Sequence, residues 1–307
     1  EVRTFVKENY IYPVDDRVLS QDTAKGIVAA LGDPHSEFLW ADELKNLVDS
    51  TNGDYTGVGM ELVLQYHQGS FYPTVFQTFS GSPAQKAGIL PGDRIIAVNG
   101  ESIVGKSLEY AVSLIKGDPG TKVVLTISRD GADRHFSITL TREKIHLSVV
   151  TYRVLGDKIG YVRISIFSMT AGEEVDSAIQ ALLKQGCEGI ILDLRGNPGG
   201  YVDAGLKTAE LFIPGGKPLM YIRTRQGSSA FISEGDPYQI PLAVLIDGES
   251  ASASEIVAGA IKDYGVGTLI GTTTYGKGTV QTVQSLETAE AAVKLTVAEY
   301  FSPKKNK

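Results

Sequence analysis

Apolar residues follow three different patterns along the 307-residue chain. Up to about residue 50 they recur at helical spacing, as in Val2, Phe5 and Val6. Turn residues at 32–34, Gly-Asp-Pro, interrupt this pattern. Residues 1–52 are therefore predicted to form a small N-terminal helical segment.

From about residue 53 the pattern changes to short runs rich in β-branched and aromatic residues. Turn residues such as Asn99-Gly100 and Asp130-Gly131 bound these runs. One helical pattern, at 107–116, interrupts them. Residues 53–144 are therefore predicted to be a mainly β domain closed by one helix.

After about residue 145, apolar runs of strand length alternate with helical patterns. The predicted strands and helices alternate along the chain: strands at 159–166, 189–194, 242–246 and 268–270, helices at 173–184, 202–212 and 254–262. Apolar strands separated by helices are typical of an α/β layer fold. Residues 145–307 are therefore predicted to be an α/β domain.

Composition narrows the function. A net charge of −7 and a pI near 5.2 argue against nucleic acid or an anionic membrane as the main partner, because those partners need a basic face. The single cysteine, Cys187, forms no intrachain disulfide and is expected to be a buried core residue. The sequence contains no metal-ligand set with the spacing of a known site, so neither a metal nor a cofactor is expected.

Two glycines, Gly57 and Gly59, precede the first predicted strand of the β domain. Glycines there let successive N–H groups turn toward one point, which suits a terminal carboxylate, although a lone Gly-x-Gly more often only shapes a hairpin. The segments at 55–62, 81–84 and 87–95 resemble PDZ domains of bacterial proteases. The resemblance implies that Gly57, Val58, Gly59 and Met60 bind a peptide C-terminus and that the next strand pairs with the peptide.

Three serines, Ser250, Ser252 and Ser254, lie between a predicted strand and a predicted helix, where backbone N–H groups can stabilise an oxyanion. A serine nucleophile needs a base, and all four histidines lie outside the predicted core elements. A lysine can replace histidine if burial or nearby charge lowers its pKa from about 10.4 toward about 7. Lys277, between two glycines, is the best candidate.

These segments resemble the carboxyl-terminal processing, or tail-specific, serine peptidases. In that family a lysine in a Gly-Lys-Gly turn follows the nucleophile by 25 residues, which selects Ser252 for Lys277. The resemblance implies that Gln281 orients the lysine and that the N–H groups of Gly199 and Ala253 form the oxyanion hole. It also implies a crotonase/ClpP-like layered core.

The neighbouring polar residues have simpler interpretations. Ser250 and Ser254 are expected to be turn and capping residues, and Glu255 a first-turn charge that favours the helix dipole. Arg195 and Asn197 are expected to hold their loop.

The sequence thus predicts a serine endopeptidase with a Ser252/Lys277 dyad and a PDZ domain that recognises apolar C-terminal tails of protein substrates. Two alternatives stay open: a catalytically silent tail-binding regulator, and an α/β enzyme of the acyl-CoA hydratase type.

The resemblance implies an extracytoplasmic location, in the periplasm or cell envelope. A homo-oligomer is one of the open options. Because the chain begins with Glu1 and stops at Lys307, we expect a piece of a longer precursor.

Overall fold

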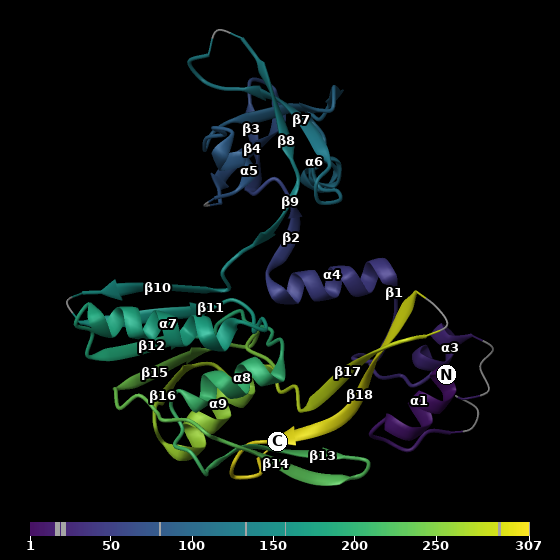
Figure 1. Cartoon of the computed structure of the whole chain (residues 1–307), viewed down its shortest axis with the longest axis vertical. Helices are drawn as coiled ribbons and strands as arrows, with labels where there is room; N and C mark the ends of the chain where they lie inside the picture. The colour runs from purple at the N-terminus through teal and green to yellow at the C-terminus, as the bar shows by residue number, and fades with distance from the viewer. Residues whose placement is uncertain are drawn as a thin grey trace. The chain divides into compact units, whose positions relative to one another are not determined.

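The computed structural model describes residues 1–15, 19, 23–79, 81–132, 134–156, 158–287 and 290–306. The chain folds into two compact units (Figure 1). The first comprises Glu1–Gly53 and Ser148–Lys307, and the second comprises Asp54–Leu147. The second unit is therefore an insertion in the chain of the first.

The first unit contains a five-stranded sheet whose middle is parallel. Strands β11, β12, β15 and β16 pair in parallel in that order, and β10 adds to β11 in the antiparallel direction. Buried aliphatic side chains such as Val162, Leu192 and Val244 fill its core. The bounds of the strands are β10 (Val150–Leu155), β11 (Ile159–Ile164), β12 (Gly189–Asp193), β15 (Leu242–Ile246) and β16 (Thr268–Gly271).

Three helices pack on this sheet. The helix α7 (Ala171–Lys184) contacts β10 and β11, while α8 (Val202–Glu210) and α9 (Ala253–Tyr264) contact each other. Cys187 lies in the same core at 5% exposure, which confirms its predicted structural role. The predicted alternation of strands and helices is confirmed, with most element ends within two residues of those expected.

A second sheet of the first unit is antiparallel and joins distant parts of the chain. Its path is β1-β18-β13-β14, with β17 paired to β18. Glu37 lies opposite Lys294 in this sheet, so the N-terminal segment pairs with the last strand. The bounds are β1 (Glu37–Trp40), β13 (Pro218–Thr224), β14 (Gly227–Ile232), β17 (Thr279–Ser285) and β18 (Ala291–Phe301).

The N-terminal helices share a core with this sheet. Val6, Val28 and Phe38 pack with Val293 and Leu295 of β18. The predicted N-terminal segment 1–52 is thus helical in large part but does not form a compact unit of its own, because its apolar face is buried on β18. The helices are α1 (Val2–Asn9), α3 (Ala24–Ala29) and α4 (Ala41–Asn52). Among the described residues, no helix is both long and apolar enough to cross a membrane.

The second unit is mainly β, as predicted. Its sheet runs β3-β4-β5-β7-β8, with β6 on β5, and a separate ladder joins β2 to β9. Tyr55 lies opposite Ile145 in that ladder, which carries the unit to residue 147 rather than to the predicted 144. The bounds are β2 (Asp54–Gly57), β3 (Met60–His67), β4 (Ser70–Thr78), α5 (Pro83–Lys86), β5 (Arg94–Val98), β6 (Glu101–Ser102), α6 (Leu108–Ile115), β7 (Lys122–Ser128), β8 (Phe136–Thr141) and β9 (Glu143–His146).

Candidate active site

Ser252 lies at the N-cap of α9, directly after the loop that follows β15. Its backbone has a φ of 55° and a ψ of −115°, a conformation that side-chain-bearing residues rarely adopt. The residue is 8% exposed. The next residue, Ala253, is the first of the helix, so its N–H has no intrahelical acceptor. The local fold therefore places the Ser252 residue where a helix N-terminus favours negative charge.

The two neighbouring serines have structural roles. The Ser250 hydroxyl donates to the carbonyl of Leu194 at 2.8 Å and accepts from the N–H of Asp247 at 3.0 Å. The Ser254 hydroxyl donates to the carbonyl of Asn197 at 3.0 Å. The bonds to Leu194 and Asn197 tie the serine segment to the loop after β12.

That loop lies directly against Ser252. Gly199 has a φ of +100°, and a Cβ there would lie 2.7 Å from the Cβ of Ser252 and 3.0 Å from the nitrogen of Ala253. The two residues predicted for the oxyanion hole are thus brought together. However, the Gly199 N–H donates to Oδ1 of Asn197 at 2.9 Å. An oxyanion would have to replace that acceptor.

Asn197 anchors the loop from a fully buried position. Its Nδ2 donates to the carbonyl of Ile164 at 3.0 Å, and its carbonyl accepts the N–H of Ala251 at 3.0 Å. The side chain of Arg195 is held on Asp193 by two hydrogen bonds. Both residues therefore hold the loop, as their predicted role requires.

Lys277 lies between β16 and β17 and is half-buried. Burial lowers the pKa of its amine, the positive charge of Lys294 lowers it further, and the carboxylates of Glu255 and Asp33 oppose both effects. Lys277 and Glu255 line a cavity of about 390 Å³ with apolar walls that include Ile256. The surroundings of Lys277 therefore shift its pKa in the direction that its predicted role as a base requires.

The proton-transfer contact itself is not formed. Between these two described residues, no hydrogen bond joins the Ser252 hydroxyl to the Lys277 amine. Gln281 also makes no hydrogen bond to the lysine within the described structure; its Nε2 donates to the hydroxyls of Thr279 and Thr296, each at 3.1 Å. Hydrogen bonds of catalytic groups often tighten only when substrate is bound.

The predicted tail-binding loop lies at the start of β3. Gly59 has a φ of +81°, and a Cβ there would lie 2.1 Å from the Cβ of Ser82, so only glycine fits. Its carbonyl accepts from the Ser82 hydroxyl at 2.9 Å. Gly57 ends β2, Val58 is buried, and Met60 begins β3. In the described sheet β3 is the terminal strand and contacts α6, so its outer backbone edge has no partner strand there.

Known proteins resemble the chain over nearly its whole length. The model of peptidase family S41 matches residues 158–307, and a PDZ domain model matches residues 80–129. The carboxy-terminal processing protease CtpA of Bacillus subtilis is 36% identical, over 97% of this chain and 63% of that protein. The carboxy-terminal-processing protease of Bartonella bacilliformis is also 36% identical, over 97% of this chain and 69% of that protein.

The chain belongs to peptidase family S41. A solved structure, the photosystem II D1 C-terminal processing protease, superposes with a TM-score of 0.56 at 30% identity, over 99% of this chain and 87% of that chain. The layered α/β fold with a PDZ domain is therefore confirmed. The chain spans slightly less than two thirds of the length of the Bacillus protein.

Two residues of this S41 family member lie at the site although the sequence patterns did not place them there. Glu255, predicted only as a helix-dipole charge, accepts hydrogen bonds from the N–H groups of Ser252 and Lys277. Burial and the charge of Lys277 lower the pKa of His35, which shows that the N-terminal segment lies near the lysine. The link from Glu255 to Lys277 and the proximity of His35 to Lys277 join segments far apart in sequence, so no local pattern signals them.

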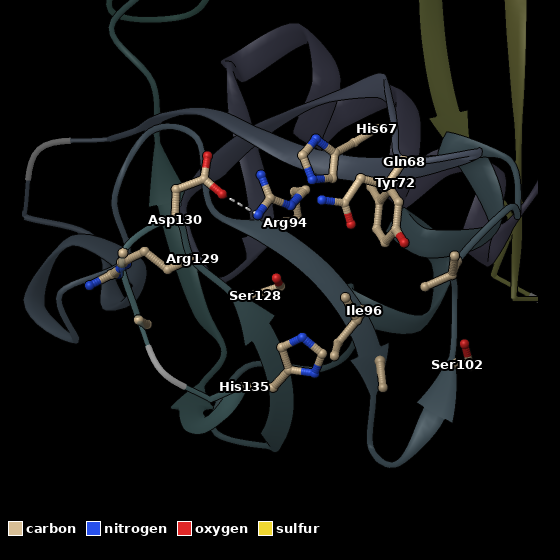
Figure 2. A pocket seen from close by; sticks show the side chains of 14 residues that line it. His67, Gln68, Tyr72, Arg94, Ile96, Ser102, Ser128, Arg129, Asp130 and His135 are labelled. Carbon is tan, nitrogen blue, oxygen red and sulfur yellow. Dashed lines mark hydrogen bonds and ion pairs between the residues drawn. The ribbon is translucent and has the colours of Figure 1, made fainter.

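The PDZ unit of this S41 chain also holds a cavity of about 650 Å³ that is lined by both polar and apolar side chains (Figure 2). Figure 2 shows Arg94 paired with Asp130 and lying near His67, with His135 on the opposite wall. None of the residues 57–60, which are predicted to bind a peptide tail, lines this cavity, whereas His67 at the end of β3 does.

Proposed function

We propose that this chain is a serine endopeptidase in which Ser252 is the nucleophile and Lys277 the general base. One observation carries the proposal: the Ser252 loop and the Lys277 turn meet at a single carboxylate at the N-terminus of α9. The lowered pKa of Lys277 supports its role as base. The names of the relatives, carboxy-terminal processing proteases, support the reaction class.

In the proposed reaction, the neutral amine of Lys277 takes the proton of the Ser252 hydroxyl as Oγ attacks the scissile carbonyl carbon. The N–H groups of Gly199 and Ala253 stabilise the oxyanion, the former after releasing Asn197. The resulting ammonium gives its proton to the departing amine, which leaves an acyl-enzyme. Water then hydrolyses the ester, and the mechanism uses no cofactor. Gln281 is proposed to orient the amine when substrate is bound.

We further propose that the PDZ unit recognises apolar C-terminal tails of protein substrates. The terminal carboxylate of the tail would accept hydrogen bonds from N–H groups of the 57–60 loop. The tail would then pair with the outer edge of β3 as an added strand. Apolar side chains of the tail would then lie against α6. The glycine required at 59 and the terminal position of β3 in its sheet support this mode.

The second candidate is a tail-binding protein that does not cut. Its support is the present geometry, in which the Gly199 N–H is engaged by Asn197 and the described Ser252 and Lys277 side chains are not hydrogen-bonded to each other. The peptidase proposal requires a conformational change that completes the site, whereas this alternative does not.

Cleavage of a loosely folded protein with an apolar C-terminal tail tests the proposal. Wild type, Ser252→Ala and Lys277→Ala are compared on this substrate and on a version without the tail. We expect wild type to cut, both variants to be inactive, and the tailless substrate to persist longer. Three equally inactive enzymes that still bind the tail would favour the regulator instead.

The extracytoplasmic location and assembly into a homo-oligomer remain proposals that rest on the family resemblance. Cell fractionation of the source organism and sedimentation of the purified chain test them. Recovery in the cytoplasm, or a monomer at all concentrations, would contradict them.

A further inference from the structure

We infer that Glu255 is a positioning residue whose carboxylate fixes the Lys277 turn against the Ser252 loop, an inference that rests on the proposed Ser/Lys mechanism. Oε2 of Glu255 accepts the N–H of Ser252 at 2.8 Å and the N–H of Lys277 at 3.0 Å. Oε1 accepts the N–H of Gly276 at 2.7 Å. One carboxylate therefore joins the segments that carry both members of the dyad.

The other surroundings of the carboxylate support this role. The buried Tyr300 donates its hydroxyl to Oε2 of Glu255 at 3.3 Å and to the carbonyl of Ser252 at 3.4 Å. Hydrogen bonds to an ionised acceptor are about twice as strong as neutral ones, and partial burial keeps water from competing. The four donors together leave the carboxylate little freedom to move.

Helix capping explains only part of this arrangement. A capping box requires the Glu255 carboxylate to accept the N–H of Ser252, three residues earlier. It does not require the N–H groups of Gly276 and Lys277, which lie 21 and 22 residues further along the chain. Glu255 also holds the backbone N–H of Ser252, whose φ of 55° needs an external restraint.

The charge of Glu255 works against a neutral lysine, because its electrostatic effect is to raise the pKa of Lys277. A carboxylate that served only electrostatics at this site would therefore oppose catalysis. The contribution of Glu255 to catalysis must then come from geometry, because the position of the turn decides how Nζ of Lys277 approaches Oγ of Ser252. Misplacement of reacting groups by about 1 Å lowers rates about 100-fold.

The test compares Glu255→Gln and Glu255→Asp with the matched control Asp203→Asn. Gln keeps the length but turns one acceptor oxygen into a donor, while Asp keeps the charge but shortens the reach by one methylene. Asp203 is an exposed acid in the first turn of α8. Cleavage kinetics over pH, thermal unfolding and amide hydrogen exchange are measured on each folded chain.

We expect both Glu255 variants to lower the plateau of kcat against pH about 100-fold, with KM changed less than about threefold. Exchange of the amides at 275–278 should speed up about tenfold, and Asp203→Asn should match wild type. A pure charge effect would spare Glu255→Asp and move the acid limb of Glu255→Gln to lower pH with an unchanged plateau. That result, or unchanged exchange, would overturn the inference.

Failure of the peptidase proposal is recognised separately. If wild type cuts no substrate, or if Ser252→Ala cuts as fast as wild type, the mechanism is wrong. Hydrogen exchange still decides whether Glu255 holds the turn in that case, because it needs no activity.

Discussion

The loop around Ser252, the proposed nucleophile, and the loop at 57–60, proposed to bind substrate tails, are held in different ways. Around Ser252, two side chains bond to backbone groups of distant segments: Asn197 donates to the carbonyl of Ile164, and Glu255 accepts from the N–H groups of Gly276 and Lys277. Around Gly59, the close packing of Ser82 shapes the loop locally, and the edge of β3 stays open. Catalysis needs fixed groups and recognition needs an open edge, so changes in the two loops should affect kcat and KM differently.

The largest effect is expected for Gly199→Ala. A Cβ at this position would lie 2.7 Å from the carbonyl oxygen of Ala251 and from the Cβ of Ser252, so the nucleophile must move. We expect kcat for cleavage to fall at least about 100-fold. The control is Gly196→Ala, which has a φ of +67° but whose nearest contact would be an ordinary 3.5 Å. Equal activity of the two variants would contradict the predicted role.

A smaller effect, in KM alone, is expected for Gly59→Ala. The new methyl group would meet Ser82, displacing the loop that is proposed to bind the terminal carboxylate. We expect KM for a tailed substrate to rise about tenfold, equivalent to about 1.4 kcal/mol, with kcat on a tailless substrate unchanged.

The matched control for this change is Gly69→Ala in the same unit. Gly69 has a φ of +90° but open space around its Cβ position. If the control loses tail preference to the same extent, general strain in the PDZ unit explains the result and the tail-binding role of residue 59 is wrong.

The smallest effect is expected for Lys294→Gln, read from the pH profile. Burial chiefly lowers the pKa of Lys277, and Lys294 lowers it further against the charges of Glu255 and Asp33. Removing this positive charge raises the folded-state pKa of Lys277, so less neutral base is present near neutral pH. The acid limb of kcat/KM should move to higher pH by a few tenths of a unit.

His35, whose own pKa Lys277 and Lys294 lower, is a further titratable neighbour, and His35→Gln separates its contribution. Lys184→Gln, an exposed lysine in the last turn of α7, controls for net charge. A shift to lower pH in Lys294→Gln would contradict the role of Lys277 as base.

The sequence predicts the parallel sheet well because its strands carry their own signal. Residues 242–246 form a strand with the predicted ends, since a strand buried on both faces is a continuous apolar run. The pairing of the antiparallel sheet is not predicted from the sequence, because Glu37 and Lys294 pair across most of the chain. No local periodicity reveals such a partner.

The same distinction applies to the site. The spacing of Ser252 and Lys277 is visible in the sequence, and the family resemblance names Gly199, but the close packing that requires glycine there appears only in the fold. The role of Glu255 is not, because a first-turn acid has the same local pattern whether or not a distant turn returns beneath it. The bond between Asn197 and Gly199 is local but depends on a backbone conformation that only the fold defines.

Covalent labelling with a fluorophosphonate tests the central claim most directly. Oγ of an activated serine displaces fluoride and gains the phosphonyl group, which mass spectrometry locates by residue. The account predicts one adduct, on Ser252, that forms faster as pH rises with a midpoint below the ordinary lysine value of about 10.4 and is lost in Lys277→Ala. An adduct on another serine, or equal labelling without Lys277, would contradict it.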